Sequence, residues 1–156
     1  MNRIEVLRKY IDEILLHMED SEERRNGYVH LYGVAQACAL ISMKRGQDAE
    51  LATMTGILHD IYSYTNMDIE DHAQKGAVMA REILASLHIT NADETEMICN
   101  AINIHSDKEA VHSDFNEVLK DADVFQQCLY NPTIEIQAPE RKKRFEALKR
   151  EFGIII

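Results

Sequence analysis

The chain carries the stretch GILHDI at residues 56–61, in which an apolar run ends with a histidine and an aspartate side by side. His59 offers a neutral nitrogen ligand and Asp60 an anionic oxygen ligand, and borderline divalent metals accept both. A His-Asp pair alone is common by chance, so its interpretation depends on which other potential metal ligands the chain contains. Further histidines and aspartates occur in stretches that otherwise indicate the buried face or the end of a helix: His30, His72, His105, Asp121 and Asp123. Because buried imidazoles and carboxylates are costly unless paired or bound to metal, this set predicts a metal centre.

Helical periodicity dominates the chain, and no stretch alternates convincingly in the manner of a strand. We therefore predict an all-α fold of about six to seven helices in a single domain spanning residues 1–156. Residues 28–130 are expected to form the core around the metal site, with the two terminal helices packing on it. The expected helices cover residues 3–18, 28–44, 48–60, 68–87, 91–105, 114–130 and 139–152.

Local signals mark several of these boundaries. Asp48 is expected to cap the third helix, Asn91 with Glu94 three residues later resembles a capping box, and Pro139 opens the last helix. Two polar segments are interpreted as connections. They are residues 20–27, which end in Asn-Gly, and residues 62–67, which follow the His-Asp pair.

The charge balance limits the classes of partner. The formal net charge is −10, which argues against an extended nucleic-acid footprint, since such a surface normally needs a basic face. An anionic small substrate stays possible because a bound dication can dominate the local field. The basic run at residues 141–144 is interpreted as a solvated face of the last helix.

No apolar run approaches the roughly 18 residues of a membrane span, and the N-terminal residues lack the apolar segment of a secretory signal. Three widely spaced cysteines, Cys38, Cys99 and Cys128, are predicted to be small core residues, which fits a reducing cytoplasm. We therefore expect a cytoplasmic protein that does not associate with membranes. The terminal Ile154–Ile156 could pack into the core or against a partner, and the oligomeric state stays open.

The ordered set of motifs resembles the HD superfamily of metal-dependent phosphohydrolases, an all-α fold, over roughly residues 28–130. Each motif alone is unspecific, whereas the ordered set is specific. The layout is especially similar to the HD-type diadenosine tetraphosphate hydrolases. The motifs are HLYGVA at residues 30–35, GILHDI at 56–61, DHAQKGA at 71–77, AINIH at 101–105 and LKDADVF at 119–125.

The resemblance implies a ligand set for one or two divalent transition metals. Imidazole and carboxylate suit Fe, Mn, Zn, Co or Ni without selecting one. Family members bind one metal through residues that match His30, His59, Asp60 and Asp123. A subset binds a second metal through two intervening histidines, which match His72 and His105. The aspartate of the pair bridges the metals in that subset, so the resemblance implies that Asp60 is also catalytic.

The chain departs from the family pattern directly after the pair. Many members continue as His-Asp-Ile-Gly-Lys, whereas residues 62–64 here are Tyr-Ser-Tyr. The missing lysine puts in doubt any mechanism that needs a cation at that place, and the two tyrosines could line the pocket instead. The candidate cations for binding a substrate phosphate are Lys75, Lys108 and Arg24.

Helical angle does not separate Asp121 from Asp123, because the two flank the buried stripe of their helix at similar angles. Only the Ala-Asp context of the family favours Asp123 as the ligand. Asp121 could then orient a ligand from outside the metal's own ligand set, or it could be solvated. Structural roles also stay open for the others: a helix cap for His59 and Asp60, a core histidine at His30 or His105, and a solvent-facing side chain at His72.

These observations predict a metal-dependent hydrolase that cleaves a phosphate ester or anhydride of a small molecule such as a nucleotide, with a metal-activated water. One alternative is an HD-type di-iron oxygenase such as inositol oxygenase, which resembles the hydrolases in the same six ligands. Turnover that depends on dioxygen would favour it. The other alternative is a non-catalytic domain that binds metal or nucleotide, which is slightly disfavoured because all six ligand positions are filled.

Overall fold

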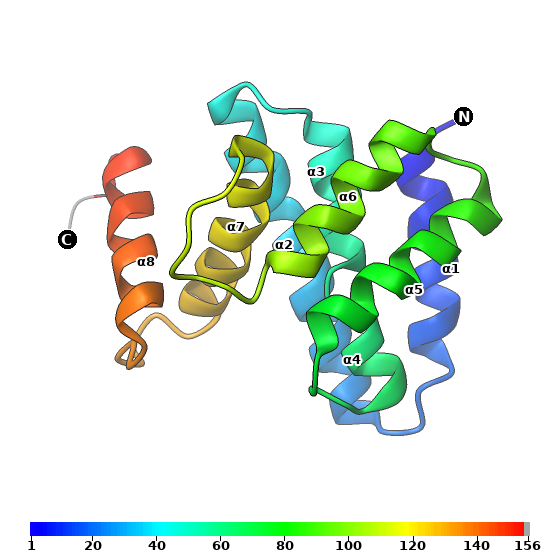
Figure 1. Cartoon of the computed structure of the whole chain (residues 1–156). Helices are drawn as coiled ribbons and strands as arrows, with labels where there is room; N and C mark the ends of the chain where they lie inside the picture. Colours follow the sequence, from blue (N-terminus) through cyan, green and yellow to red (C-terminus); the bar gives the residue numbers. More distant parts are fainter. Residues whose placement is uncertain (155–156) are drawn as a thin grey trace.

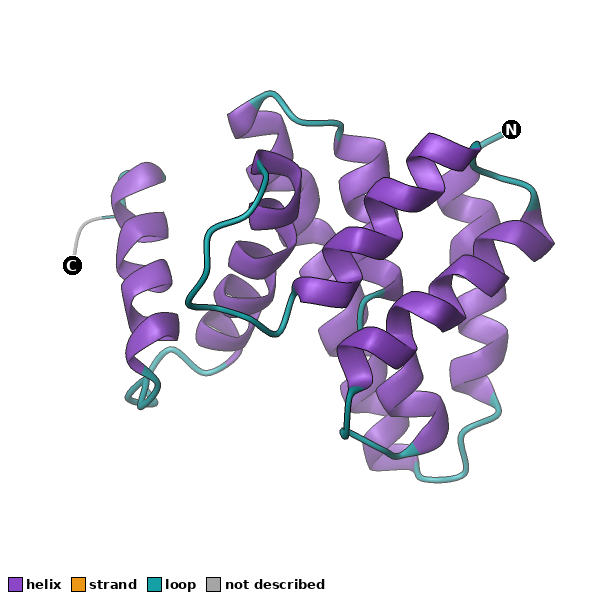
Figure 2. Ribbon diagram, in the orientation of Figure 1, coloured by secondary structure: helices purple, strands orange, loops and turns teal. Residues whose placement is uncertain are grey.

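The computed structural model describes residues 1–154 and is helical throughout, with no strand in that range (Figure 2). The predicted all-α class is confirmed. The described chain forms eight helices: α1 (Arg3–Leu16), α2 (Ser21–Arg45), α3 (Ala49–Leu58), α4 (Ile61–Asn66), α5 (His72–Leu87), α6 (Ala92–Ile104), α7 (Asp114–Tyr130) and α8 (Pro139–Glu151).

Helix α2 lies at the centre of the arrangement and contacts α1, α3, α4 and α7 (Figure 1). Its buried positions pack with those of α3 and α7 into the main apolar core. In Figure 1, α1 and α8 lie at opposite ends of the molecule. Helix α8 packs on α7 through aromatic side chains, with Phe152 stacked on Phe125 at a ring-centroid distance of 5.8 Å. The elements that carry the candidate ligands therefore lie between the two terminal helices.

The predicted caps are confirmed. The Asp48 side chain accepts a hydrogen bond from the backbone N–H of Leu51 at the start of α3. Asn91 and Glu94 form a reciprocal capping box at the start of α6. Pro139 is the first residue of α8, where its missing N–H costs nothing.

The interpretation of residues 20–27 as a connection was wrong, because α2 already begins at Ser21. The Asp20 side chain accepts hydrogen bonds from the N–H groups of Glu22 and Glu23, so it caps a helix that starts seven residues earlier than expected. Gly27 lies inside this helix, where an added Cβ would come within 3.1 Å of the Leu15 side chain. The glycine therefore permits close packing of α2 and does not mark a turn.

Residues 62–67 were also expected to form a connection, but most of them belong to the short helix α4. Helix α4 ends at Asn66, and the following Met67 has a positive φ of 50°, the left-handed conformation that commonly follows a helix. The next helix, α5, begins at His72 and not near Asp68. This short extra helix accounts for the difference between the expected number of helices and the eight observed in residues 1–154.

Gly56 is required by the contact between α3 and α2. A Cβ at this position would lie 2.6 Å from the Cα atom of Ala35, and backbone cannot move aside as a flexible side chain can. We expect Gly56→Ala to destabilise the protein by roughly 1–3 kcal/mol, because overpacking outweighs the gain in helix propensity. Thermal unfolding should show a melting temperature lower by about 3–10 °C for a chain of this length.

Gly33→Ala is the matched comparison for that substitution. Its Cβ would meet the side chain of Gln126 at 2.8 Å, and that side chain can rotate away. A loss of stability at Gly56 no larger than the loss at Gly33 would contradict the close-packing explanation.

None of the helices in the described residues is both long enough and apolar enough to span a membrane. Cys38 and Cys99 are buried and Cys128 is half-buried, all as free thiols. Ile154 is 44% exposed. The rest of the terminal isoleucine run, Ile155 and Ile156, lies outside the described residues, so the two expectations for it, packing into the core or against a partner, stay predictions.

Candidate metal centre

The six predicted ligands come together from five places in the fold. His30 comes from α2 and Asp123 from α7. His59 and Asp60 occupy the junction between α3 and α4. His72 is the first residue of α5, and His105 follows the last residue of α6. The convergence of these side chains on one point was predicted, and the structure places them together.

The first group is formed by His30, His59 and Asp60. The Nε2 atoms of the two histidines are 3.1 Å apart, and they lie 3.2 Å and 3.3 Å from Asp60 Oδ2. Asp123 Oδ1 lies 3.5 Å from His30 Nε2 and 3.9 Å from His59 Nε2, so it lies close to both histidines of this group. Ligand atoms around a metal with bonds of about 2.1 Å are roughly 3.0–3.4 Å apart, so the spacing within the group matches a metal site.

The second group is formed by Asp60, His72 and His105. Asp60 Oδ1 lies 3.2 Å from His105 Nε2 and 3.7 Å from His72 Nε2. Asp60 thus directs one carboxylate oxygen to each group, and its position joins them. His105 is buried and His72 is partly exposed, so the second group lies nearer the surface.

The break between α3 and α4 lets two consecutive side chains reach the same point. On a continuous helix, neighbouring residues project about 100° apart. Here α3 ends at Leu58, and Asp60 leaves the helical conformation with φ of −116° and ψ of 11°. Gly76 keeps α5 close to this junction, since a Cβ there would lie 3.2 Å from the carbonyl oxygen of His59.

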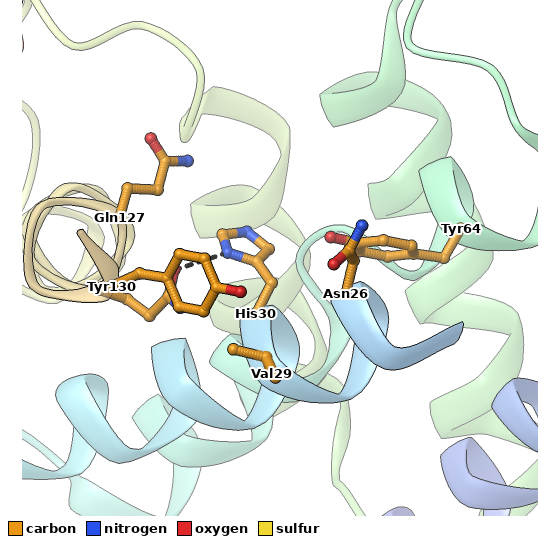
Figure 3. A pocket seen from close by; sticks show the side chains of 7 residues that line it. Asn26, Val29, His30, Tyr64, Gln127 and Tyr130 are labelled. Atoms are coloured by element: carbon orange, nitrogen blue, oxygen red, sulfur yellow. Dashed lines mark hydrogen bonds between the residues drawn. The ribbon is translucent and has the colours of Figure 1, made fainter. Parts of the chain in front are cut away.

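Each histidine of the site has its Nδ1 fixed by an oxygen that can only accept a hydrogen bond. His30 Nδ1 donates to the side-chain oxygen of Gln126 at 2.9 Å (Figure 3). The other three rings donate to the backbone carbonyl three residues earlier: His59 to Gly56, His72 to Ile69 and His105 to Ile102. A neutral imidazole with its proton on Nδ1 presents a lone pair at Nε2, which is the form that binds a metal.

These tautomers make the centre of the site rich in lone pairs. Nitrogen lone pairs on His30 and His59 then face each other and the oxygens of Asp60, with no hydrogen to share between them. Asp60 Oδ1 is a buried side-chain oxygen without a hydrogen-bond partner among residues 1–154. Buried acceptors that face one another need a cation or a proton between them. The donor set and its geometry therefore fit divalent metal ions.

The pKa shifts of Asp60 and His30 indicate which charge the site attracts. Burial opposes ionisation of Asp60, but the surrounding imidazoles, His59 foremost, hold the pKa of Asp60 well below its usual value. Burial lowers the pKa of His30, yet the neighbouring carboxylates of Asp60 and Asp123 outweigh it and raise that pKa above its usual value. Both shifts show that the site attracts positive charge.

Asp123 is anchored by two neighbours that the sequence did not reveal in this role. Its Oδ2 accepts a hydrogen bond from Lys108 Nζ at 2.7 Å, and its Oδ1 accepts one from the amide of Gln127 at 3.0 Å. Burial opposes ionisation of Asp123, but Lys108, with His59 and His30, holds its pKa well below the usual range. Asp123, which the family context favoured over Asp121, is therefore the aspartate that lies beside the histidines. Its carboxyl group is ionised.

Lys108 was predicted to bind a substrate phosphate, and that prediction was wrong. The side chain is buried, and its ammonium group is occupied by Asp123 and by the carbonyl oxygen of His105. Lys108 lies in the loop between α6 and α7, and its two contacts link the end of α6, next to His105, to Asp123 on α7. Its role is to position Asp123.

Asp121 does not orient a ligand, contrary to one of the two roles considered for it, and it is not solvated either. Its Oδ2 accepts a hydrogen bond from Arg45 at 2.8 Å, and its Oδ1 accepts one from Arg144 at 2.8 Å. Arg144 also pairs with Glu117, so it is not part of a solvated basic face as was expected for residues 141–144. Asp121 links α7 to α2 and α8 on the far side of the helix from the histidines.

The other two predicted phosphate-binding cations are not brought to the site. Lys75 pairs with Asp68 at 3.0 Å on the surface. Arg24 donates to the backbone carbonyl of Met18 and so closes the turn between α1 and α2. Gln126 and Gln127 were missed as supporting residues, because a glutamine on a helix gives no sequence signal until its partner is known.

Two cavities open beside the site. One, of about 370 Å³, is lined by Asn26, Val29, His30, Tyr64, Gln126, Gln127 and Tyr130 (Figure 3). The other, of about 320 Å³, is lined by Glu23, Asp60, Ser63, Tyr64, Met67, Ile69 and His72. Tyr64 borders both, so the expectation that a tyrosine after the His-Asp pair lines the pocket is confirmed for this residue. Burial, with the charge of Asp60, raises the pKa of Tyr64 and keeps its phenol protonated.

Comparisons with known proteins agree with the architecture. The sequence model described as the HD domain matches residues 27–127. A crystal structure described as a predicted HD superfamily hydrolase from an uncultured Thermotogales bacterium superposes with a TM-score of 0.62 at 19% sequence identity. The superposition covers 96% of this chain and 88% of that one, and it shows a shared fold. A comparison with curated proteins finds no match. Because the family match covers well over half of the chain and includes all six converging residues, the chain belongs to the HD domain family.

Proposed function

We propose that this protein is a metal-dependent phosphohydrolase, which cleaves a phosphate ester or anhydride of a small molecule such as a nucleotide. The observation that carries the proposal is the pair of ligand groups joined by Asp60, in which imidazole lone pairs and carboxylate oxygens face one another. The description of the structural neighbour as a predicted hydrolase supports the same reaction class.

The chain's own residues would prepare the site for this chemistry. When bound, divalent ions supply Lewis acidity toward a phosphoryl oxygen and lower the pKa of a water toward about 7. His30, His59, Asp60 and Asp123 would hold one ion, and Asp60, His72 and His105 a second. The carbonyl oxygens and Gln126 accept a hydrogen bond from each Nδ1 and so direct each Nε2 inward, and Lys108 with Gln127 fixes Asp123. The donor set contains no thiolate and suits Fe, Mn, Zn, Co or Ni.

The test begins with protein purified without chelator, whose metal content is measured and whose activity is assayed on a panel of phosphate esters and anhydrides. We expect hydrolysis that stops on removal of metal by EDTA, returns on addition of a first-row divalent ion and is unchanged without dioxygen. Turnover that requires dioxygen would instead identify an oxygenase. Bound metal with no turnover of any compound would identify a non-catalytic domain.

A further inference from the structure

The cavity beside His30 has an uncharged lining apart from the candidate ligand itself. Carboxamides and phenols supply its polar groups, and Val29 supplies an apolar wall. Figure 3 shows Tyr130 on one side of His30, and Asn26 with Tyr64 on the other. At about 370 Å³ the cavity lies in the range of sites that bind small organic molecules. Its position next to a candidate ligand makes it the place for the organic part of a substrate.

Three polar groups of this lining are free to bind a ligand. Within residues 1–154, the Asn26 amide, the Tyr64 hydroxyl and the Tyr130 hydroxyl make no hydrogen bond to protein. A carboxamide can donate one hydrogen bond and accept another from the same ligand, and a phenol hydroxyl can donate or accept. Tyr130 is 65% exposed at the end of α7, so its ring offers a flat apolar face that a bound ring could cover. The cavity therefore suits a flat, uncharged group that has hydrogen-bonding edges.

The surroundings offer little charge for additional phosphates. No lysine or arginine of the described chain lines either of the two cavities beside the site, and Glu23 lines the one next to His72. The ammonium group of Lys108, three residues after His105, pairs with Asp123. Two dications on Asp60 and Asp123 would leave enough positive charge for one phosphate dianion. Further phosphates of a polyphosphate chain would find no lysine or arginine among the residues that line these two cavities, and Arg141 reaches the first cavity only through the hydrogen bond that it donates to Gln127.

We propose that the substrate is a phosphate monoester of a flat, uncharged, hydrogen-bonding group, with the chemistry of a nucleoside monophosphate, whose organic part binds between Tyr64 and Tyr130. The inference rests on the proposed function and names its substrate class. It distinguishes this protein from hydrolases of dinucleoside polyphosphates, which the motif layout resembles.

The experiment compares metal-loaded protein on adenosine 5′-monophosphate, ribose 5-phosphate and diadenosine tetraphosphate. The adenosine monoester should be the best of the three by kcat/KM. Tyr130→Ala should raise KM for the adenosine monoester by about 5- to 100-fold, because stacking of a base on an aromatic ring is worth that much. KM for ribose 5-phosphate, and kcat for both, should change little. Tyr130→Phe should keep most of the affinity.

Two controls separate the cavity from general effects. Tyr10→Ala removes a partly exposed ring from α1, away from the cavity, and should leave every constant unchanged. Calorimetric titration with adenosine, which carries no phosphate, measures binding in the cavity without turnover. Its binding should be weakened by Tyr130→Ala and unaffected by Tyr10→Ala.

Equal kcat/KM for ribose 5-phosphate and the adenosine monoester, or an equal effect of Tyr130→Ala on both, would overturn the inference. Preference for diadenosine tetraphosphate would overturn it as well, while leaving the proposed hydrolase function in place. Failure of the metal-loaded protein to hydrolyse any phosphate compound would overturn the proposed function, and this inference with it.

Discussion

Asp60→Asn is expected to remove bound metal from both groups and to abolish hydrolysis. Asp60 is the residue that both groups share, and each of its oxygens lies within 3.2–3.7 Å of two histidine Nε2 atoms. An amide lacks the negative charge and offers only one oxygen. The fall in metal affinity should exceed the 10–100-fold that loss of an outer hydrogen-bond partner produces. Metal analysis after dialysis against buffer, together with the rate on the best substrate, measures both effects.

Asp93→Asn is the control for this substitution, because it makes the same chemical change at an exposed position in the first turn of α6. Its metal content and activity should equal those of the unmodified protein. Retention of two ions per chain by the Asp60 variant would show that the carboxylate does not join the groups.

The second large effect separates Asp123 from Asp121, two residues apart on α7. Asp123→Asn should abolish tight metal binding at the first group and all hydrolysis, since its Oδ1 faces His30 and His59. Asp121→Asn should leave metal content unchanged, because its carboxylate pairs with Arg45 and Arg144 on the other side of the helix. Metal content and activity are measured for both variants.

Asp121→Asn should instead lower stability by roughly 1–2 kcal/mol, because Arg45 and Arg144 lose one carboxylate but keep Glu151 and Glu117. That loss corresponds to a melting temperature lower by about 2–8 °C. Asp123→Asn should also lose stability, because it leaves the buried Lys108 ammonium without its carboxylate. Metal content is therefore the deciding readout. An Asp121 variant without metal beside an Asp123 variant that keeps it would reverse the assignment.

The residues at the centre of the site were predictable because polar, titratable side chains are unusual at positions that the helical pattern predicts to be buried. An imidazole or carboxylate on the buried side of a helix stands out against apolar neighbours, and the sequence order of six such residues matched a known family. The caps at Asp48 and Asn91 were predictable for a similar reason, since a capping residue acts within three residues of itself. Local signals and ordered motifs thus led to the fold class and to the converging ligand types.

What the sequence did not reveal depends on contacts between distant segments. Asp121 and Asp123 have similar positions relative to the buried stripe of α7. The Asp121 side chain is directed away from the histidines by its ion pairs with Arg45 from α2 and Arg144 from α8. Lys108 resembled a surface lysine until Asp123 was found 15 residues away in sequence and 2.7 Å away in space. Gly27 suggested a turn beside Asn26, yet Leu15 and Tyr64 show that it serves close packing.

The most direct test of the account is the number of divalent ions that the protein binds. Protein stripped with chelator would be titrated with Mn²⁺ in a calorimeter, with His105→Ala as the companion variant. We expect two ions per chain for the unmodified protein and one for the variant, because His105 belongs only to the second group. Fewer than one tightly bound ion per chain, or the same stoichiometry in both proteins, would contradict the assignment of the two ligand groups joined by Asp60.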